Sequence, residues 1–161
     1  AFSSEEVTAV GVNNAVVHTS NGGVTWQSLT GPAAGITLNC IWMMSESVWL
    51  VGTANGRLYY TIDSGVTWVE KPFSGSGAGA VNDIKFSTNS VGFMAHRTAA
   101  PLGRILRTID GGNSWYVLPE GSGAIPDNDG LNAITVCTDP NIVYGGGITV
   151  AAGDGIIIAG A

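Results

Sequence analysis

An eight-residue motif occurs three times in this chain, and this repeat constrains the fold more than any other feature. Each copy begins with Thr, has Asp or Asn third, Gly fifth and Thr or Ser seventh, and ends with Trp. The copies span residues 19–26, 61–68 and 108–115, and their tryptophans are 42 and 47 residues apart. A period in the forties matches one four-stranded blade of a β-propeller. The chain has no sustained 3.6-residue apolar pattern of the kind that predicts helices.

A second motif, of the form apolar-Asn-x-Ile, lies between the copies of the first. It occurs at residues 38–41, 81–84 and 131–134, and each copy begins a short alternating strand. Second strands are expected at 48–52, 91–95 and 142–145, third strands at 57–61 and 104–108, and a fourth strand around the Trp, as in 67–70. Two motifs in constant phase predict an all-β fold, a β-propeller of four-stranded antiparallel blades.

The repeats divide residues 1–161, a single propeller domain or propeller fragment, into two full and two partial blades. The blades cover about residues 7–37 (partial), 38–79, 80–130 and 131–161 (partial). Closed propellers have about four to eight blades, which leaves three possibilities: a piece of a longer chain, a small closed ring, or assembly with other copies. Unpaired sheet edges are adhesive, so we expect a protein partner or self-association through open blade edges.

The chemistry of the first motif, here called the box, predicts a structural role. Its Asp or Asn can accept hydrogen bonds from backbone N–H groups just ahead of it, and its Gly can take a positive φ without steric cost. The hydroxyl adds a local bond, and the Trp is expected to anchor the turn in the core between blades. The residues concerned are Asn21, Gly23, Thr25, Trp26, Asp63, Gly65, Thr67, Trp68, Asp110, Gly112, Ser114 and Trp115.

The three boxes resemble the Asp-box repeat, also called the sialidase-type or BNR repeat. The fuller unit at residues 81–115 is similar to the propellers of photosystem II stability and assembly factors. The resemblance implies the blade but not a function, because such blades occur in sialidases, other glycosidases, sortilin-like receptors, assembly factors and virus proteins. In that superfamily the box lies at the blade periphery, away from the substrate face, so its presence does not favour catalysis.

Enzymatic interpretations find little support in the sequence. A sialidase-like site would require an arginine cluster, but Arg57 and Arg104 hold equivalent repeat positions, which suits a framework better than one pocket. A glycosidase requires two carboxylates across a cleft. Asp83 on an inner strand is the best candidate, but the sequence gives it no partner, so we interpret it as a solvated channel or turn residue. We therefore expect no catalytic residue in this segment, with a glycosidase as the enzyme alternative.

The charge of the chain and its few candidate metal-ligating side chains argue against several other classes of function. The net charge is −6 with six Lys and Arg that form no stripe, which argues against nucleic-acid binding. No apolar stretch is long enough to span a membrane. His18 and His96 lack metal-ligand spacing to each other or to cysteine. An acidic loop with Asp127 and Asp129 offers oxygens for Ca²⁺, with a plain turn as the alternative, and we otherwise expect no cofactor or metal.

Binding is the remaining class. An enlarged turn, residues 96–103, is the first candidate binding loop, through His96, Arg97, Pro101 and Leu102, and residues 119–130 form the second. Aromatic residues outside the boxes, Trp42 among them, can stack on sugar rings or anchor a protein partner, although most are expected between sheets.

We therefore interpret the chain as a non-catalytic interaction or structural module of an extracellular, cell-envelope or virion assembly. The alternative is a glycan-binding or glycoside-hydrolase-related propeller whose active groups lie partly outside this segment. The sequence leaves open whether Cys40 and Cys137 form a disulfide or are buried free thiols.

Overall fold

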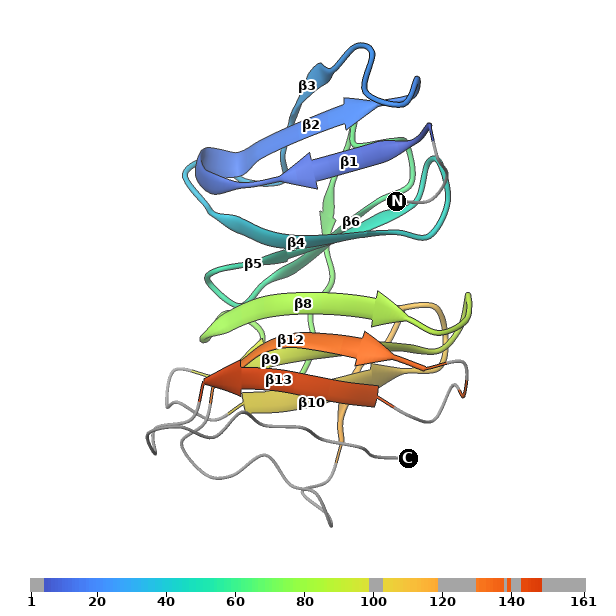
Figure 1. Cartoon of the computed structure of the whole chain (residues 1–161). Coiled ribbons are helices and arrows are strands. Elements are labelled where there is room, and N and C mark those ends of the chain that lie inside the picture. Colours follow the sequence, from blue (N-terminus) through green and yellow to red (C-terminus); the bar gives the residue numbers. More distant parts are fainter. Residues whose placement is uncertain (1–4, 99–102, 119–129, 138, 140–142, 149–161) are drawn as a thin grey trace.

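The computed structural model of the chain describes residues 5–98, 103–118, 130–137, 139 and 143–148, and within these ranges the fold is antiparallel β throughout (Figure 1). A 3₁₀ turn, Val12–Asn14, is the one helical element in the described ranges. The strands are β1 (Val7–Val10), β2 (Ala15–Thr19), β3 (Gln27–Thr30), β4 (Leu38–Met43), β5 (Trp49–Thr53), β6 (Leu58–Thr61), β7 (Val69–Glu70), β8 (Ala80–Phe86), β9 (Gly92–Arg97), β10 (Gly103–Thr108), β11 (Tyr116–Val117), β12 (Gly130–Val136) and β13 (Val143–Ile148).

These strands form separate sheets in chain order. Sheet 1 contains β1 to β3, sheet 2 contains β4 to β7, sheet 3 contains β8 to β11, and sheet 4 contains β12 and β13. Sheets 2 and 3 each have four strands paired in sequence order, which confirms the predicted all-β class with four-stranded antiparallel blades. The end of the last partial blade, where residues 155–161 align with a third strand, lies outside the described residues.

The strand ends depart from their expected positions in one systematic way. The fourth strands β7 and β11 contain only two residues each, and β7 begins at Val69 where the sequence predicted a start at Thr67. The cause is visible at Thr67, whose N–H donates to the Asp63 carboxylate and is therefore not available to a strand ladder. The box extends the turn at the expense of the outer strand.

Consecutive sheets stack face to face, so the apolar core lies between them (Figure 1). Side chains alternate between the two faces, as the period of a strand requires: Phe93 packs toward sheet 4 and Met94 toward sheet 2. The buried clusters are Val16, Leu38 and Val51 between sheets 1 and 2; Cys40, Leu50, Leu58, Val81, Ile84, Phe86, Met94, Leu106 and Trp115 between sheets 2 and 3; and Phe93, Ala95, Ile105, Leu131, Ile134 and Val143 between sheets 3 and 4. Each sheet therefore depends on its neighbour for burial.

The apolar-Asn-x-Ile motif places a bulge in each of the strands β4, β8 and β12. The register against the second strand shifts at the Asn, between Leu38 and Cys40 in β4 and at the equivalent points in β8 and β12. A bulged residue is left out of the ladder, so its side chain is free to make other contacts. Asn39 and Asn82 use this freedom to bond to the backbone of the next sheet.

Candidate functional site

Each box closes the turn between the third and fourth strands by the same set of hydrogen bonds. In sheet 2 the Thr61 hydroxyl donates to Asp63 Oδ1 over 2.7 Å and accepts from the Gly65 N–H over 3.0 Å. Asp63 Oδ1 also accepts from the Thr67 N–H at 2.8 Å. Gly65 has φ +83°, a conformation that favours glycine. Equivalent bonds recur in sheets 1 and 3.

The charge of the box differs between sheets. In sheets 2 and 3 the hydroxyls of Thr67 and Ser114 donate to Asp63 and Asp110, and these bonds lower the pKa of each carboxyl from 3.8 to about 2. In sheet 1 the donor and acceptor are exchanged, because the Asn21 amide donates to the Thr25 hydroxyl oxygen at 2.8 Å. An amide therefore reproduces the turn without its charge.

The three box tryptophans lie in different environments. Trp115 is 7 % exposed and packs in the core between sheets 2 and 3. Trp68 packs against the core between sheets 1 and 2, and its indole N–H donates to the Thr30 carbonyl of sheet 1 at 3.0 Å. Trp26 is 50 % exposed, so the expectation that every box Trp anchors a core is wrong at this position. The cause is position in the stack: Trp68 and Trp115 cover the preceding sheet, and no sheet precedes sheet 1 in the described part of the chain.

The edge of β1 is open within the described residues, because sheet 1 has no counterpart of the inner strands β4 and β8. The strands β1, β5 and β9 are equivalent, because Val7, Trp49 and Gly92 each pair with the first Thr of a box. β5 and β9 also pair with the bulged strands β4 and β8 on their other side. Within the described residues β1 pairs with β2 alone, although Leu38 N–H donates to the Gly11 carbonyl just beyond its end. Sheet 1 therefore presents an unpaired edge where the complete sheets have an inner strand.

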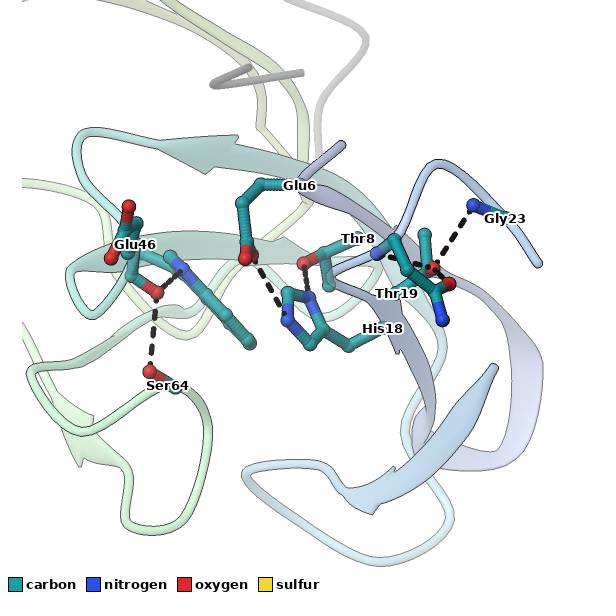
Figure 2. Close-up of polar contacts among 9 residues, drawn as sticks. Glu6, Thr8, His18, Thr19, Gly23, Glu46 and Ser64 are labelled. Carbon is teal, nitrogen blue, oxygen red and sulfur yellow. Dashed lines mark hydrogen bonds and ion pairs between the residues drawn. The ribbon is translucent and has the colours of Figure 1, made fainter. Parts of the chain in front are cut away.

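A polar cluster lies on sheet 1 near this edge (Figure 2). His18 Nδ1 is 2.9 Å from the Thr8 hydroxyl, and His18 Nε2 is 3.1 Å from Glu6 Oε2. The imidazole also packs on Trp49 of sheet 2, with 5.1 Å between ring centroids. This cluster was not predicted from the sequence, although Thr8 occupies a repeat position that is apolar in the complete sheets.

The cluster has the connectivity of a hydroxyl, a base and an orienting carboxylate, as in hydrolase triads. Thr8 is only 9 % exposed, so its hydroxyl has little access to a substrate. Buried polar groups require hydrogen-bond partners, and Thr8, His18 and Glu6 act as partners for one another. The arrangement therefore fits polar packing of sheet 1 against sheet 2.

Asp83 is more enclosed than expected. Its side chain is 16 % exposed, and its two oxygens accept hydrogen bonds from Lys85 and from the Ile134 N–H of sheet 4. Asp83 is therefore less solvated than expected, because it pairs with Ala95 in the ladder and its side chain reaches the backbone of the next sheet. In the described ranges no second carboxylate bonds with it, and no group of three or more His, Cys, Asp or Glu side chains could hold a metal ion.

The candidate binding loop at residues 96–103 is shorter than expected. β9 extends through Arg97, and His96 is fully buried, with Nε2 2.9 Å from the Ala78 carbonyl and its ring against Phe73. His96 is therefore a core residue and not a binding-loop residue, because the segment containing Phe73 and Ala78 covers it. Arg97 is exposed at the strand end, whereas Pro101 and Leu102 lie outside the described residues.

The remaining sequence candidates are placed as follows. Residues 119–129, with the calcium candidates Asp127 and Asp129, lie outside the described residues. Cys40 and Cys137 are free thiols, and burial raises the pKa of Cys40 to about 12. Arg57 pairs with Glu70 on the same sheet, at 2.7 Å. No helix in the described ranges is long and apolar enough to cross a membrane.

No protein-family model and no curated protein matches the chain. Among solved structures it is similar to YCF48 bound to D1 peptide, with 18 % identity and a TM-score of 0.66 over 97 % of this chain and 51 % of that one. YCF48 from Cyanidioschyzon merolae has 15 % identity and the same TM-score over 99 % of this chain and 52 % of its own. The chain thus spans about half the length of these proteins.

Two further similarities cover different shares of the known structure. An ancestral GH74 enzyme is similar with 18 % identity and a TM-score of 0.73 over 90 % of this chain and 20 % of its own. The computationally designed Ika4 protein has 14 % identity and a TM-score of 0.60 over 99 % of this chain and 88 % of its own. Identities this low show the fold alone. The chain has the fold of β-propeller blades, two of them complete.

Proposed function

We propose that this chain is a non-catalytic propeller module of the Asp-box type that binds protein through the open edge of its first sheet. The observation that carries the proposal is the edge of β1, with which no strand of the described ranges pairs, whereas β5 and β9 each pair with a bulged inner strand. An unpaired edge offers backbone donors and acceptors to an incoming strand. The module would serve an extracellular, cell-envelope or virion assembly, in which a partner or another copy covers this edge.

The complete sheets define what the missing strand would look like. It would run antiparallel to β1 and carry the apolar-Asn-x-Ile motif, with its Ile opposite Ala9, as Ile41 lies opposite Val51 and Ile84 opposite Met94. YCF48, one of the similar propeller proteins, has been seen bound to a D1 peptide.

An enzymatic or glycan-binding role is the second candidate, since GH74 enzymes share the fold. In the described residues the carboxylates that carry shifted pKa values, Asp63 and Asp110, are engaged in box turns. This arrangement favours the interaction module over a hydrolase.

The test is a strand-addition experiment on the full chain. A labelled peptide with the sequence of β8, residues 80–86, is expected to bind saturably, as measured by fluorescence anisotropy. A matched peptide N-methylated at the positions of Ile84 and Lys85 is expected not to bind. Successive N–H groups point to opposite sides of a strand, so one of these two would donate to β1 and the methyl group removes it. Equal binding of both peptides, or binding of neither, would overturn the proposal. Light scattering on the native protein then separates self-association from capture of a different partner.

A further inference from the structure

A pocket lies between sheets 2 and 3, at the turns that follow β4 and β8, away from the β1 edge. Its volume is about 260 Å³, and its lining residues are Trp42, Met43, Met44, Phe86, Ser87, Thr88 and Asn89. Pockets for drug-sized ligands measure about 300–1,000 Å³, so this one suits a ligand of about one ring.

Repeat comparison separates framework residues from those special to this pocket. Met43, Phe86 and Val136 occupy the same repeat position and are all apolar, as a blade core requires. One position earlier, Trp42 stands where the next two blades have Lys85 and Thr135. The framework therefore does not need an aromatic residue at this position. Trp42 is half-buried and stacked on Phe86, with 6.1 Å between ring centroids and 24° between ring planes. The pocket thus has a fixed aromatic wall that the repeat alone does not explain.

The rim of the pocket offers hydrogen-bonding groups that the fold leaves unused. The Thr88 hydroxyl oxygen accepts from the N–H groups of Ser90 and Val91, so its own proton remains available to a ligand. Asn89 is exposed, and within the described residues its side-chain amide makes no hydrogen bond. The turn itself is rigid, because Ser87 and Thr88 both donate from their N–H groups to the Val91 carbonyl, and Gly111 donates to the Ser90 carbonyl.

We propose that this pocket binds a single neutral pyranose ring, stacked by its C–H face on the exposed part of Trp42. An aromatic wall with an adjacent hydroxyl and amide matches a sugar, which has one apolar face and a belt of hydroxyls. Among the described residues no charged side chain lines the pocket, and the nearby Lys85, whose Nζ is 5.9 Å from the Trp42 ring centroid, is paired with Asp83. This favours a neutral sugar over an acidic one. The site is independent of the β1 edge, so the strand-addition proposal can fail without affecting it.

The test titrates the full chain with the methyl glycosides of glucose, galactose, mannose, xylose and N-acetylglucosamine, followed by NMR. At least one glycoside is expected to bind with a dissociation constant on the order of 1 mM, a level typical of one stacked ring with a few hydrogen bonds. The resonances that shift should be the Trp42 indole N–H and the Asn89 side-chain amide. A proline-rich peptide is titrated in parallel, because an apolar peptide side chain is the competing occupant.

Two variants test whether the sugar binds in this pocket. Trp42→Thr places the residue of the fourth blade at this position and is expected to weaken binding by about tenfold or more. Trp26→Thr removes a half-exposed tryptophan outside the pocket and should leave binding unchanged. Three outcomes would overturn the proposal: no saturable binding by any glycoside up to about 50 mM, binding unaffected by Trp42→Thr, or binding of the peptide in place of the sugars.

Discussion

The side-chain amide of Asn39 donates a hydrogen bond to the backbone carbonyl of Val81, 3.1 Å away on the next sheet. Asn82 makes the equivalent bond to the carbonyl of Leu131, at 2.7 Å. Both asparagines occupy the bulge of an inner strand, and both acceptors belong to residues that are fully buried. The same bond thus occurs in two consecutive blades, and in each case one asparagine side chain links its sheet to the sheet that follows in the sequence.

Removal of this link should destabilise the stack. Asn82→Ala is expected to lower the free energy of unfolding by about 1–3 kcal/mol, because it leaves the buried Leu131 carbonyl without its partner. The measurement is urea unfolding followed by circular dichroism. Asn132→Ala is the matched control, since Asn132 holds the same motif position but is exposed and makes no side-chain hydrogen bond within the described residues. Its effect should stay within about 0.5 kcal/mol, and equal effects of the two variants would contradict the role of the link.

The box carboxylates should make stability sensitive to acid. The pKa of Asp63 and of Asp110 is lowered from 3.8 to about 2 in the folded chain, so the unfolded chain binds more protons in this range. The stabilisation is present above pH 3.8 and is lost as the pH falls toward about 2.

The double variant Asp63→Asn/Asp110→Asn should flatten this part of the pH profile, because the amide of Asn21 already supports the same turn in sheet 1. The free energy of unfolding is measured between about pH 2 and pH 5, a range that includes both the unfolded value of 3.8 and the folded value of about 2. The reciprocal variant Asn21→Asp should steepen the profile. An unchanged slope in both variants would show that other carboxyls dominate acid unfolding.

His96 should make the free energy of unfolding depend on pH in a separate, higher range. Burial lowers its pKa below the ordinary value of 6.5, so protonation favours the unfolded chain. The stabilisation from neutral His96 is complete above pH 6.5 and is lost as the pH falls through the lowered pKa. His96→Gln keeps a donor for the Ala78 carbonyl but cannot titrate, and its stability should vary less with pH just below 6.5. A slope identical to that of the unmodified chain in this window would contradict the assignment.

The fold could be predicted because it depends on local patterns that are present in the sequence. The box fixes a turn through bonds that span at most four residues, such as those of Thr61 with Asp63 and Gly65. The apolar-Asn-x-Ile motif marks the inner strand of each blade by its own residues. Such short-range chemistry is readable without knowledge of the neighbours, so sheet order and blade phase could be predicted.

Environments set by a neighbouring segment could not be predicted in the same way. His96 reads as part of a long turn, and only the covering segment with Phe73 and Ala78 makes it a core residue. Trp26 ends the same box motif as Trp115, yet its burial depends on whether another sheet precedes its own. The Trp42 pocket likewise requires the turn of the next blade, which strand alternation does not place.

Substitution of the box tryptophans should report which sheet faces are covered in solution. Trp115→Ala is expected to cost about 3–5 kcal/mol of unfolding free energy, because Trp115 is 7 % exposed and removal of a buried Trp leaves a cavity. Trp26→Ala should cost no more than about half as much, since its side chain is 50 % exposed. Urea unfolding of the isolated chain checks both values and is repeated at a low and a high protein concentration. If Trp26→Ala is as costly as Trp115→Ala, the face of sheet 1 is already covered in solution, and the exposure of Trp26 does not describe the chain in solution. If the cost of Trp26→Ala rises with protein concentration, the covering element is another copy of the chain, because association stabilises the folded state by mass action.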